Sequence, residues 1–354
     1  MKKLKTRSQH PKNHICPICC ILPPHITDRV ILNGTESQRE WALQALRESE
    51  QFRGRREAVG SIRFMAPAGS KRRTVYNAKN LTDLPGTIAR GEGDPSTGDL
   101  AVDEAYNGSG ATYDFFYEVF KRNSIDGLGM RLDSTVHYDR KYDNAFWNGS
   151  QMVYGDGDGE LFNRFTISID VIGHELTHGV TQNEAALVYR GQPGALNESF
   201  SDVFGILIKQ RILNQTADQS NWIIGEGLFT SRVNGVGIRS MKAPGTAYND
   251  RVIGKDPQPA DMKNIYTGTA DNGGVHINSG IPNRAFYLMA TAIGGYAWEK
   301  AGKIWYIALT ERLRARSNFR TAANTMILIA GELYGQNSKE QKAVRDAWKT
   351  VGVI

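Results

Sequence analysis

Apolar residues recur at helical spacing through the second half of the chain. From Ile167 onward they repeat every three or four positions, which is typical of amphipathic helices. The helices predicted on this basis cover residues 167–182, 196–211, 281–293, 300–313, 321–334 and 338–350.

Residues 72–163 carry shorter, alternating patterns that favour strands. Residues 74–78, 134–138 and 152–154 are rich in β-branched and aromatic side chains, and one helix is predicted over 111–123. The Gly-Asp-Gly-Asp-Gly run at 155–159 lacks the spacing and closing glutamate of an EF-hand, so a tight turn is favoured over a calcium loop.

These patterns together predict an α+β fold with two lobes. A β-rich N-terminal lobe would be joined to a helical C-terminal lobe by the helix at 167–182. The length of 354 residues suits this organisation, and no apolar run approaches the ~20 residues of a membrane helix.

The first 57 residues differ from the rest in charge and in cysteine content. They hold 11 Lys and Arg against 6 Asp and Glu, which leaves only +1 of the total +6 for the remaining chain. That balance argues against a nucleic-acid-binding body. Cys16, Cys19 and Cys20 all lie here, and with His14 they could suggest a zinc knuckle, but a second ligand pair is missing.

The pattern within this segment indicates a detachable prosegment. Pro23 and Pro24 favour an extended element, Ser37 begins a helix through residue 46, and residues 52–56 form a basic, flexible run open to proteolysis. No secretory signal is readable, so a cytoplasmic start is the default expectation, with export by another route left open.

Residues 174–178 read His-Glu-Leu-Thr-His. On a helix, His174 and His178 lie one turn apart on the same face and can bind one ion together, while Glu175 is placed to hold a water. With Glu198 as third ligand, the fourth zinc position stays open, as in catalytic sites. A chance match on an ordinary helix is the alternative, at about one chain in a hundred of this length.

Other residues complete the chemistry of peptide hydrolysis. Asp202 shares a helix face with Glu198 and can accept the second N–H of His174. Glu175 can take a proton from water and pass it to the leaving amine. His276, oriented by Asp271, can stabilise the oxyanion, although such a histidine is as often merely packed.

Several long motifs resemble the thermolysin family of neutral metalloproteases. They are residues 144–149 (Asn-Ala-Phe-Trp-Asn-Gly) through Gly159, the metal helix, residues 194–198 (Gly-Ala-Leu-Asn-Glu) and residues 271–280. The match runs from about Thr74 to the C-terminus. The short prosegment with Pro23-Pro24 is more similar to the protealysin-like branch than to the secreted enzymes with long propeptides.

The resemblance implies a role for each matching position. The residues concerned are the zinc ligands His174, His178 and Glu198, the general base Glu175, the oxyanion partners His276 and Tyr189, and the orienting carboxylates Asp271 and Asp202. Asn144 and the backbone of Ala145 would hold the substrate main chain, and Arg239 a substrate carbonyl. An apolar pocket, implying cleavage before bulky hydrophobic residues, would be lined by Phe162, Phe165, Val171, Ile224, Leu228 and Ile238.

One departure from the family pattern concerns its double calcium site. Asp170 and Glu226 are retained, but an acidic position on the second ligand helix is Lys209, and two others are Asn221 and Ile223. An ammonium among these carboxylates would repel calcium, so we doubt that this site binds the ion.

The sequence thus predicts a zinc endopeptidase made as a zymogen. The expected divisions are a propeptide at 1–57, a β-rich lobe with the zinc helix at 58–189 and a helical lobe at 190–354. Pro23 and Pro24 are expected to block the cleft, in preference to zinc ligation by a cysteine thiolate or a folding-only role. Expected partners are peptide substrates and the propeptide, with no nucleic acid, no membrane and a monomeric state. A silent zinc-binding homologue is the alternative, which the filled catalytic positions disfavour.

Overall fold

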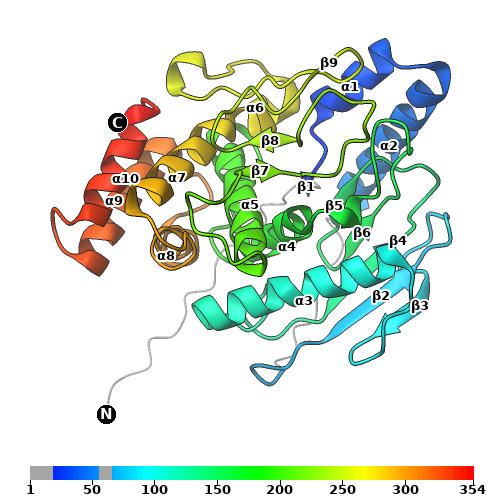
Figure 1. Cartoon of the computed structure of the whole chain (residues 1–354), viewed down its shortest axis with the longest axis horizontal. Coiled ribbons are helices and arrows are strands. Elements are labelled where there is room, and N and C mark those ends of the chain that lie inside the picture. Colours follow the sequence, from blue (N-terminus) through cyan, green and yellow to red (C-terminus); the bar gives the residue numbers. More distant parts are fainter. Residues whose placement is uncertain (1–18, 56–65) are drawn as a thin grey trace.

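The computed structural model describes residues 19–55 and 66–354, which form two lobes around a central helix (Figure 1). One lobe is built on a six-stranded sheet and the other is helical, with α4 (Ile169–Asn183) between them. The α+β architecture expected from the sequence is confirmed. Across the described residues, no helix is both long and apolar enough to span a membrane.

The sheet is mixed and has the order β1-β5-β6-β4-β2-β3. Its strands are β1 (Cys19–Cys20), β2 (Arg73–Asn77), β3 (Thr87–Gly91), β4 (Leu132–Val136), β5 (Ala145–Trp147) and β6 (Met152–Tyr154). The pairs β2–β4 and β4–β6 are parallel, and the other three are antiparallel. The N-terminal strand β1 therefore forms one edge of a sheet that otherwise belongs to the β-rich lobe.

The two faces of this sheet are covered by different helices. Side chains alternate along β5, so Ala145 and Trp147 join the main core while Phe146 joins a smaller cluster on the other face. Helix α3 (Leu100–Phe120) packs on the main-core side. Helix α2 (Glu36–Arg55) contributes Ala45 to the smaller cluster. The N-terminal segment thus completes part of the β-rich lobe.

Two expectations about the N-terminal segment are wrong. Pro24 is not extended: it is the first residue of α1 (Pro24–Asn33), a position where proline's fixed φ and missing N–H are tolerated, and Pro23 precedes it with φ −63° and ψ 142°. The basic run expected to be flexible from Phe52 continues α2 as far as Arg55. The helix predicted from Ser37 is confirmed within α2.

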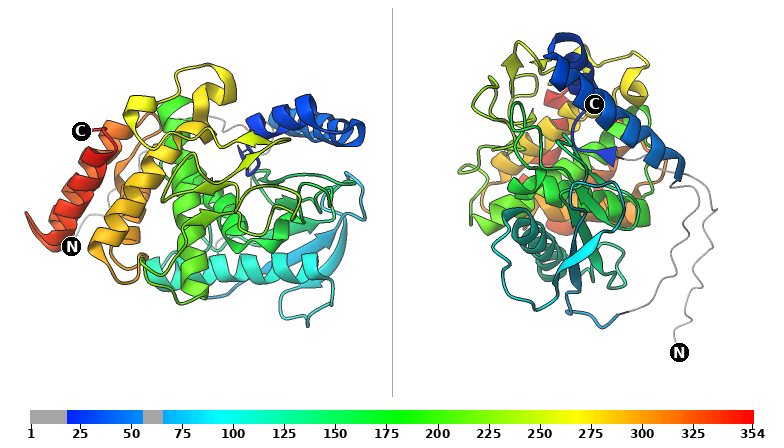
Figure 2. Two further views of the ribbon diagram at one scale, coloured as in Figure 1. Left: turned by 45° about the horizontal axis from the view of Figure 1, so that its top comes forward. Right: turned by 90° about the vertical axis from the view of Figure 1, so that its right-hand side faces the viewer.

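The helical lobe follows the periodicity of the sequence closely. Its helices are α5 (Gly191–Ile212), α6 (Ala270–Asn278), α7 (Gly280–Ile293), α8 (Ala301–Ile307) with a π turn at Ala308–Arg312, α9 (Phe319–Tyr334) and α10 (Lys339–Thr350). Short turns of 3-10 helix cover Phe165–Ile167 and Met262–Asn264, and two small hairpins pair β7 (Ile223–Ile224) with β8 (Arg239–Ser240) and β9 (Asn249–Asp250) with β10 (Gly254–Lys255). Figure 2 shows the yellow-to-red helices of this lobe beside the green helices α4 and α5.

Two elements of the β-rich lobe depart from the predicted bounds. Helix α3 begins eleven residues earlier than expected, because Gly108-Ser109-Gly110, which disfavours a helix locally, lies in its buried middle. Strand β4 ends at Val136 because His137 adopts φ 53°. At residues 155–159, where a tight turn is predicted, the chain leaves β6 as an irregular loop with positive φ at Gly157 and Gly159. Asp158 accepts backbone N–H groups from residues 160–162.

The packing of α4 against α5 positions the functional residues. Gly173 and Gly205 face each other across the contact of α4 with α5, where a Cβ atom on Gly173 would lie 3.2 Å from Gly205 Cα. A Cβ atom on Gly205 would lie 2.4 Å from the carbonyl oxygen of Asp170, and one on Gly173 would lie 2.7 Å from Ile208 Cδ1. Glycine at both positions therefore lets the two helices approach closely enough for their polar residues to meet.

Candidate active site and metal centre

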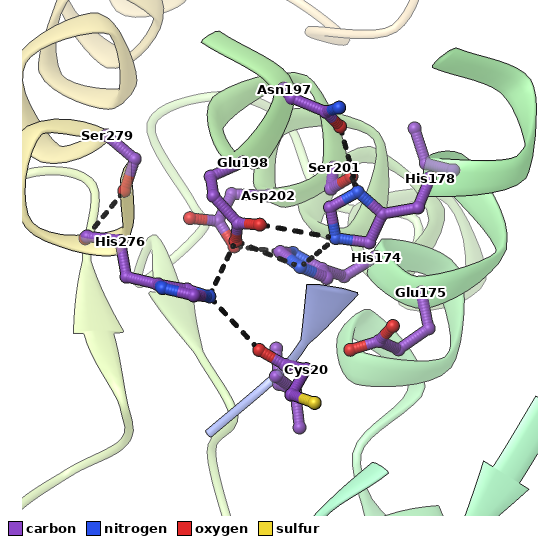
Figure 3. Close-up of polar contacts among 12 residues, drawn as sticks. Cys20, His174, Glu175, His178, Asn197, Glu198, Ser201, Asp202, His276 and Ser279 are labelled. Atoms are coloured by element: carbon purple, nitrogen blue, oxygen red, sulfur yellow. Dashed lines mark hydrogen bonds and ion pairs between the residues drawn. The ribbon is translucent and has the colours of Figure 1, made fainter. Parts of the chain in front are cut away.

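His174, His178 and Glu198 converge from α4 and α5 (Figure 3). The two Nε2 atoms lie 3.0 Å apart, and Glu198 Oε2 lies 3.4 Å from His174 Nε2. All three residues are at most 2% exposed, and Glu198 Oε2 makes no hydrogen bond within the described structure. Their ligand atoms lie within 4.8 Å of one another. A buried His₂Glu set with an unsatisfied carboxylate oxygen fits a zinc ion with an open fourth position.

The outer nitrogens of both histidines have hydrogen-bond acceptors. His174 Nδ1 lies 2.8 Å from Asp202 Oδ1, as the sequence predicts. His178 Nδ1 lies 2.9 Å from Asn197 Oδ1, a contact the sequence analysis missed. Donation through Nδ1 fixes the tautomer in which Nε2 presents its lone pair to a metal. Asn197 could have been found, because it lies next to Glu198 on the same helix.

Asp202 also anchors a buried arginine. Arg239 from β8 donates to both carboxylate oxygens, at 2.7 and 2.8 Å, and Asn283 donates at 2.8 Å. Burial alone would raise the pKa of Asp202, but Arg239 and His174 hold it at about 2. A carboxylate with these partners stays ionised, so it can keep His174 oriented.

Glu175 follows the first histidine and lies on the cleft side of α4. Its Oε2 accepts a hydrogen bond from the backbone N–H of Trp147 at 3.1 Å, and its Oε1 makes none within the described residues. Burial raises the pKa of Glu175 to about 8. The carboxylate therefore has one oxygen held and one available for a water.

His276 and Tyr189 meet on the opposite side of the cluster. The Tyr189 hydroxyl lies 3.0 Å from His276 Nε2 and donates to Glu198. Asp271 holds the His276 ring through Nδ1 at 2.6 Å and its backbone N–H at 2.8 Å. Burial lowers the pKa of His276, but Asp271 and Glu198 raise it above its ordinary value. Residues 271–274 all have positive φ, an uncommon conformation in the segment that brings the Asp271 carboxylate to Nδ1 of the ring.

An extended stretch of the N-terminal segment lies in this site. The Ile21 N–H donates to Ala145 O at 3.1 Å, and the Leu22 N–H donates to Asn144 Oδ1 at 3.1 Å. Arg239 Nη1 donates to Ile21 O at 3.3 Å, and His276 Nε2 lies 3.2 Å from Cys20 O. The cleft is therefore occupied by the main chain of residues 20–22, and Pro24 lines the same pocket beside Asn144 and His276. Blockage of the cleft by the two prolines stays a prediction.

The thiol of Cys20 does not face the metal cluster. Its side chain packs with Ala45, Phe146 and Val153 on the other face of the sheet, while its carbonyl oxygen points to His276. Zinc ligation by Cys20 is therefore not supported. His14 and Cys16, which the zinc-knuckle alternative needs, lie outside the described residues.

The apolar residues assigned to the substrate pocket are all buried in the main core. They are Phe162, Phe165, Val171, Ile224, Leu228 and Ile238, each at most 1% exposed. Ile21 and Leu22 belong to the same apolar cluster. The pocket itself remains a prediction, but the segment in the cleft does place apolar side chains in this core.

Lys209 lies among the acidic residues at which the sequence resemblance implied a calcium site. Its Nζ lies 2.9 Å from Glu226 Oε2, 3.3 Å from Asp170 Oδ2 and 3.2 Å from the Ile223 carbonyl. Burial would lower the pKa of Lys209, but the two carboxylates raise it above its ordinary value. The ammonium therefore stays charged beside the two carboxylates.

The contact of Asn197 with His178 gives a first prediction. Asn197→Ala should weaken zinc binding by about tenfold, because His178 Nδ1 then keeps only the Ser201 hydroxyl, 3.1 Å away, as a partner. Zinc affinity can be measured by competition with a chromogenic chelator. The exposed Asn249→Ala variant is the control and should bind zinc as the wild type does. Equal affinities in both variants would contradict the role of Asn197.

His25 on α1 gives a prediction about pH. Its Nε2 lies 2.8 Å from the Tyr248 hydroxyl, while its buried Nδ1 has no partner among the described residues. Burial is the main cause that lowers the pKa of His25 to about 4. Asp271 opposes this shift, while the positive charges of His276, Arg239 and Arg29 add to it. His25 therefore stays neutral in the folded state at pH values where it is already protonated in the unfolded chain, whose histidine pKa is about 6.5.

The stabilisation from neutral His25 is complete above pH 6.5 and should be lost as pH falls toward 4. His25→Gln removes this titration but can keep a hydrogen bond to Tyr248. In denaturant unfolding, the wild type should lose about 2 kcal/mol relative to His25→Gln between pH 7.5 and 4.5. Parallel pH profiles of the two proteins would show that His25 does not couple to folding.

Comparison with known proteins places this arrangement in a family. Residues 61–182 match the thermolysin metallopeptidase catalytic domain, and residues 185–353 match its alpha-helical domain. An extracellular metalloprotease of Pectobacterium carotovorum subsp. carotovorum is 50% identical over 95% of this chain and 97% of its own length. A thermolysin of Alicyclobacillus acidocaldarius subsp. acidocaldarius is 43% identical over 79% of this chain and 50% of its own length.

A solved structure extends the likeness to the N-terminal segment. The precursor of protealysin, a metalloproteinase from Serratia proteamaculans, is 53% identical, with a TM-score of 0.88 over 95% of this chain and all of that one. This coverage includes helices before the catalytic domain, as in a precursor. With two family domains spanning residues 61–353 and a His₂Glu centre between its lobes, the chain belongs to the thermolysin metallopeptidase family.

Proposed function

We propose that this zinc-dependent endopeptidase uses Glu175 as its general base and is made latent by residues 1–57. The observation that carries the proposal is the main chain of residues 20–22 lying between Glu175 and His276, hydrogen-bonded as a peptide substrate would be. Zinc, when bound by His174, His178 and Glu198, supplies a Lewis acid and lowers the pKa of a water. The divisions at 58–189 and 190–354 for the two catalytic lobes are part of this proposal.

The protein's own residues account for the other steps. Asn144, Ala145 and Arg239 hold the substrate main chain in an extended form against β5. Glu175 takes a proton from the attacking water and delivers it to the leaving amine. His276 and Tyr189 donate hydrogen bonds to the developing oxyanion, with His276 held by Asp271. Burial of Ile21 in the main core supports a preference for bulky apolar residues after the cleaved bond.

Action outside the cell is the better-supported location. The Pectobacterium relative is named an extracellular metalloprotease. The expectation of a cytoplasmic protein finds no support among the relatives. A latent precursor suits an enzyme that must not act before it reaches its destination. A monomeric state remains part of the proposal.

Replacing the general base tests the proposed mechanism. Glu175→Ala should reduce hydrolysis of casein or a furylacryloyl peptide by at least about a thousandfold, because no other group can take the water proton. Zinc content should remain one ion per chain, since no ligand is removed. The exposed Glu299→Ala variant is the matched control and should keep full activity. Substantial turnover by Glu175→Ala would refute the role.

We further propose that Lys209 replaces calcium at the family's double site. Asp170 is fully buried and its Oδ2 makes no hydrogen bond within the described chain, so the Lys209 ammonium 3.3 Å away supplies its charge partner. An ion with two charges would compete with this ammonium for the same oxygens. The site is thus stabilised from within the chain.

Lys209→Met should lower the free energy of unfolding by about 3 kcal/mol, because a buried carboxylate loses its partner. Glu226→Gln is the control and should cost less than about 1 kcal/mol, since Glu226 is half exposed. Calcium-selective chelation, with zinc kept, should leave the melting temperature of the wild type unchanged. A large loss on chelation would show that the wild type holds calcium.

A further inference from the structure

The peptide bond between Cys20 and Ile21 lies in the position of a bond about to be cleaved. On its carbonyl side, Cys20 O lies 3.2 Å from Nε2 of His276, the proposed oxyanion partner. On its amide side, the Ile21 N–H donates to Ala145 O at 3.1 Å. In the view of Figure 3, Cys20 lies between His276 and Glu175. The catalytic groups therefore flank this one bond.

The residues after the bond fix the register. Arg239 Nη1 donates to the Ile21 carbonyl at 3.3 Å, and Asn144 Oδ1 accepts from the Leu22 N–H at 3.1 Å. Ile21 is 0% exposed and lies in the apolar cluster, as the residue after the cleaved bond should. A slip of one residue would break all four contacts, because successive carbonyls point in opposite directions along an extended chain.

We propose that the enzyme cuts its own N-terminal segment between Cys20 and Ile21, while that segment lies in the cleft. This rests on the proposed function of Glu175. Water adds to the carbonyl carbon of Cys20, and the C–N bond to Ile21 breaks. Glu175 passes the water proton to the Ile21 nitrogen. The products are a carboxylate at Cys20 and an amine at Ile21.

The surrounding structure makes this cut slow and local. The new amine stays close to the carboxylate, because α1 remains hydrogen-bonded to the catalytic domain. His25 bonds the Tyr248 hydroxyl, and Asn33 Nδ2 donates to Val252 O at 3.2 Å. The other product is held by the pairing of Cys19 and Cys20 with β5. Because both new chain ends stay bound in the cleft, re-formation of the peptide bond competes with separation of the two pieces. The bond is also buried, so a second enzyme molecule cannot reach it.

The cut would change the N-terminal segment from a continuous inhibitor into two pieces. Among the described residues, the piece that ends at Cys20 would then be held by the two-residue strand β1. Their departure would vacate the position beside His276, while α1 and α2 could remain bound. Activation would therefore include a cut inside the segment in addition to a cut near its junction with the catalytic domain.

A time course on the full-length zinc-loaded chain tests the proposal by intact mass and N-terminal sequencing. We expect a fragment that begins Ile-Leu-Pro-Pro. Its first-order rate constant of formation should not depend on protein concentration, because each molecule cuts itself. Ile21→Gly should slow this cut by at least about tenfold by removing the apolar side chain after the bond, while Ile21→Leu should keep it. Cleavage in or just after the basic run at residues 52–56 should persist in both variants.

A second readout does not depend on activity. In full-length Glu175→Ala, the Leu22 amide should be protected from hydrogen exchange, and adding Asn144→Ala should remove that protection by at least about tenfold. Equal exchange in the two proteins would overturn the register. Added mature enzyme should leave the Cys20–Ile21 bond of Glu175→Ala intact, and a cut there would overturn cleavage in place.

The possible failures are distinguishable. Hydrolysis of casein together with a junction cut, but with no Ile21 terminus at any time, would overturn this inference and leave the proposed function standing. Absence of casein hydrolysis after removal of the segment would overturn the proposed function itself, and the inference with it.

Discussion

The close approach of α4 and α5 is the constraint on which the metal centre depends. Gly173 and Gly205 remove the Cβ atoms that would hold the helices apart, since one on Gly205 would lie 2.4 Å from a carbonyl oxygen. At this separation His174 and Glu198 share a buried site. A wider spacing would leave a carboxylate buried without partners, which costs several kcal/mol. The glycines therefore belong to the site as much as its ligands do.

From this contact a continuous polar network reaches the cleft. Asp202 accepts from His174 and from Arg239, and Arg239 donates in turn to the main chain of Ile21. A buried guanidinium is tolerated because it makes a two-pronged contact with a carboxylate that stays ionised. The same arginine thus links the orientation of a metal ligand to the position of the peptide in the cleft. Metal geometry and substrate alignment are coupled through one side chain.

The metal centre could be predicted from the sequence because its signal is local. His174 and His178 are one helical turn apart, and Glu198 and Asp202 repeat that spacing on α5. The contents of the cleft could not be predicted in this way. The pairing of residues 19–20 with β5 joins positions more than 120 apart, and Pro24 beginning a helix depends on α1 having a surface to pack against. His25 and Asn197 were missed for a related reason: one needs a partner 223 residues away, and the other acts through a histidine.

The remaining question is how one cleft serves both latency and catalysis. Strand β5 ends the sheet of the catalytic domain, and its outer backbone groups are satisfied by β1 and by Ile21. An unpaired edge strand accepts any extended peptide, because its hydrogen bonds reach only main-chain atoms. The propeptide and a substrate would use the same bonds, so main-chain pairing cannot distinguish inhibitor from substrate. The distinction between inhibitor and substrate must come from what holds the bound segment in place. In this chain, that is the packing of α1 and α2 against the two lobes.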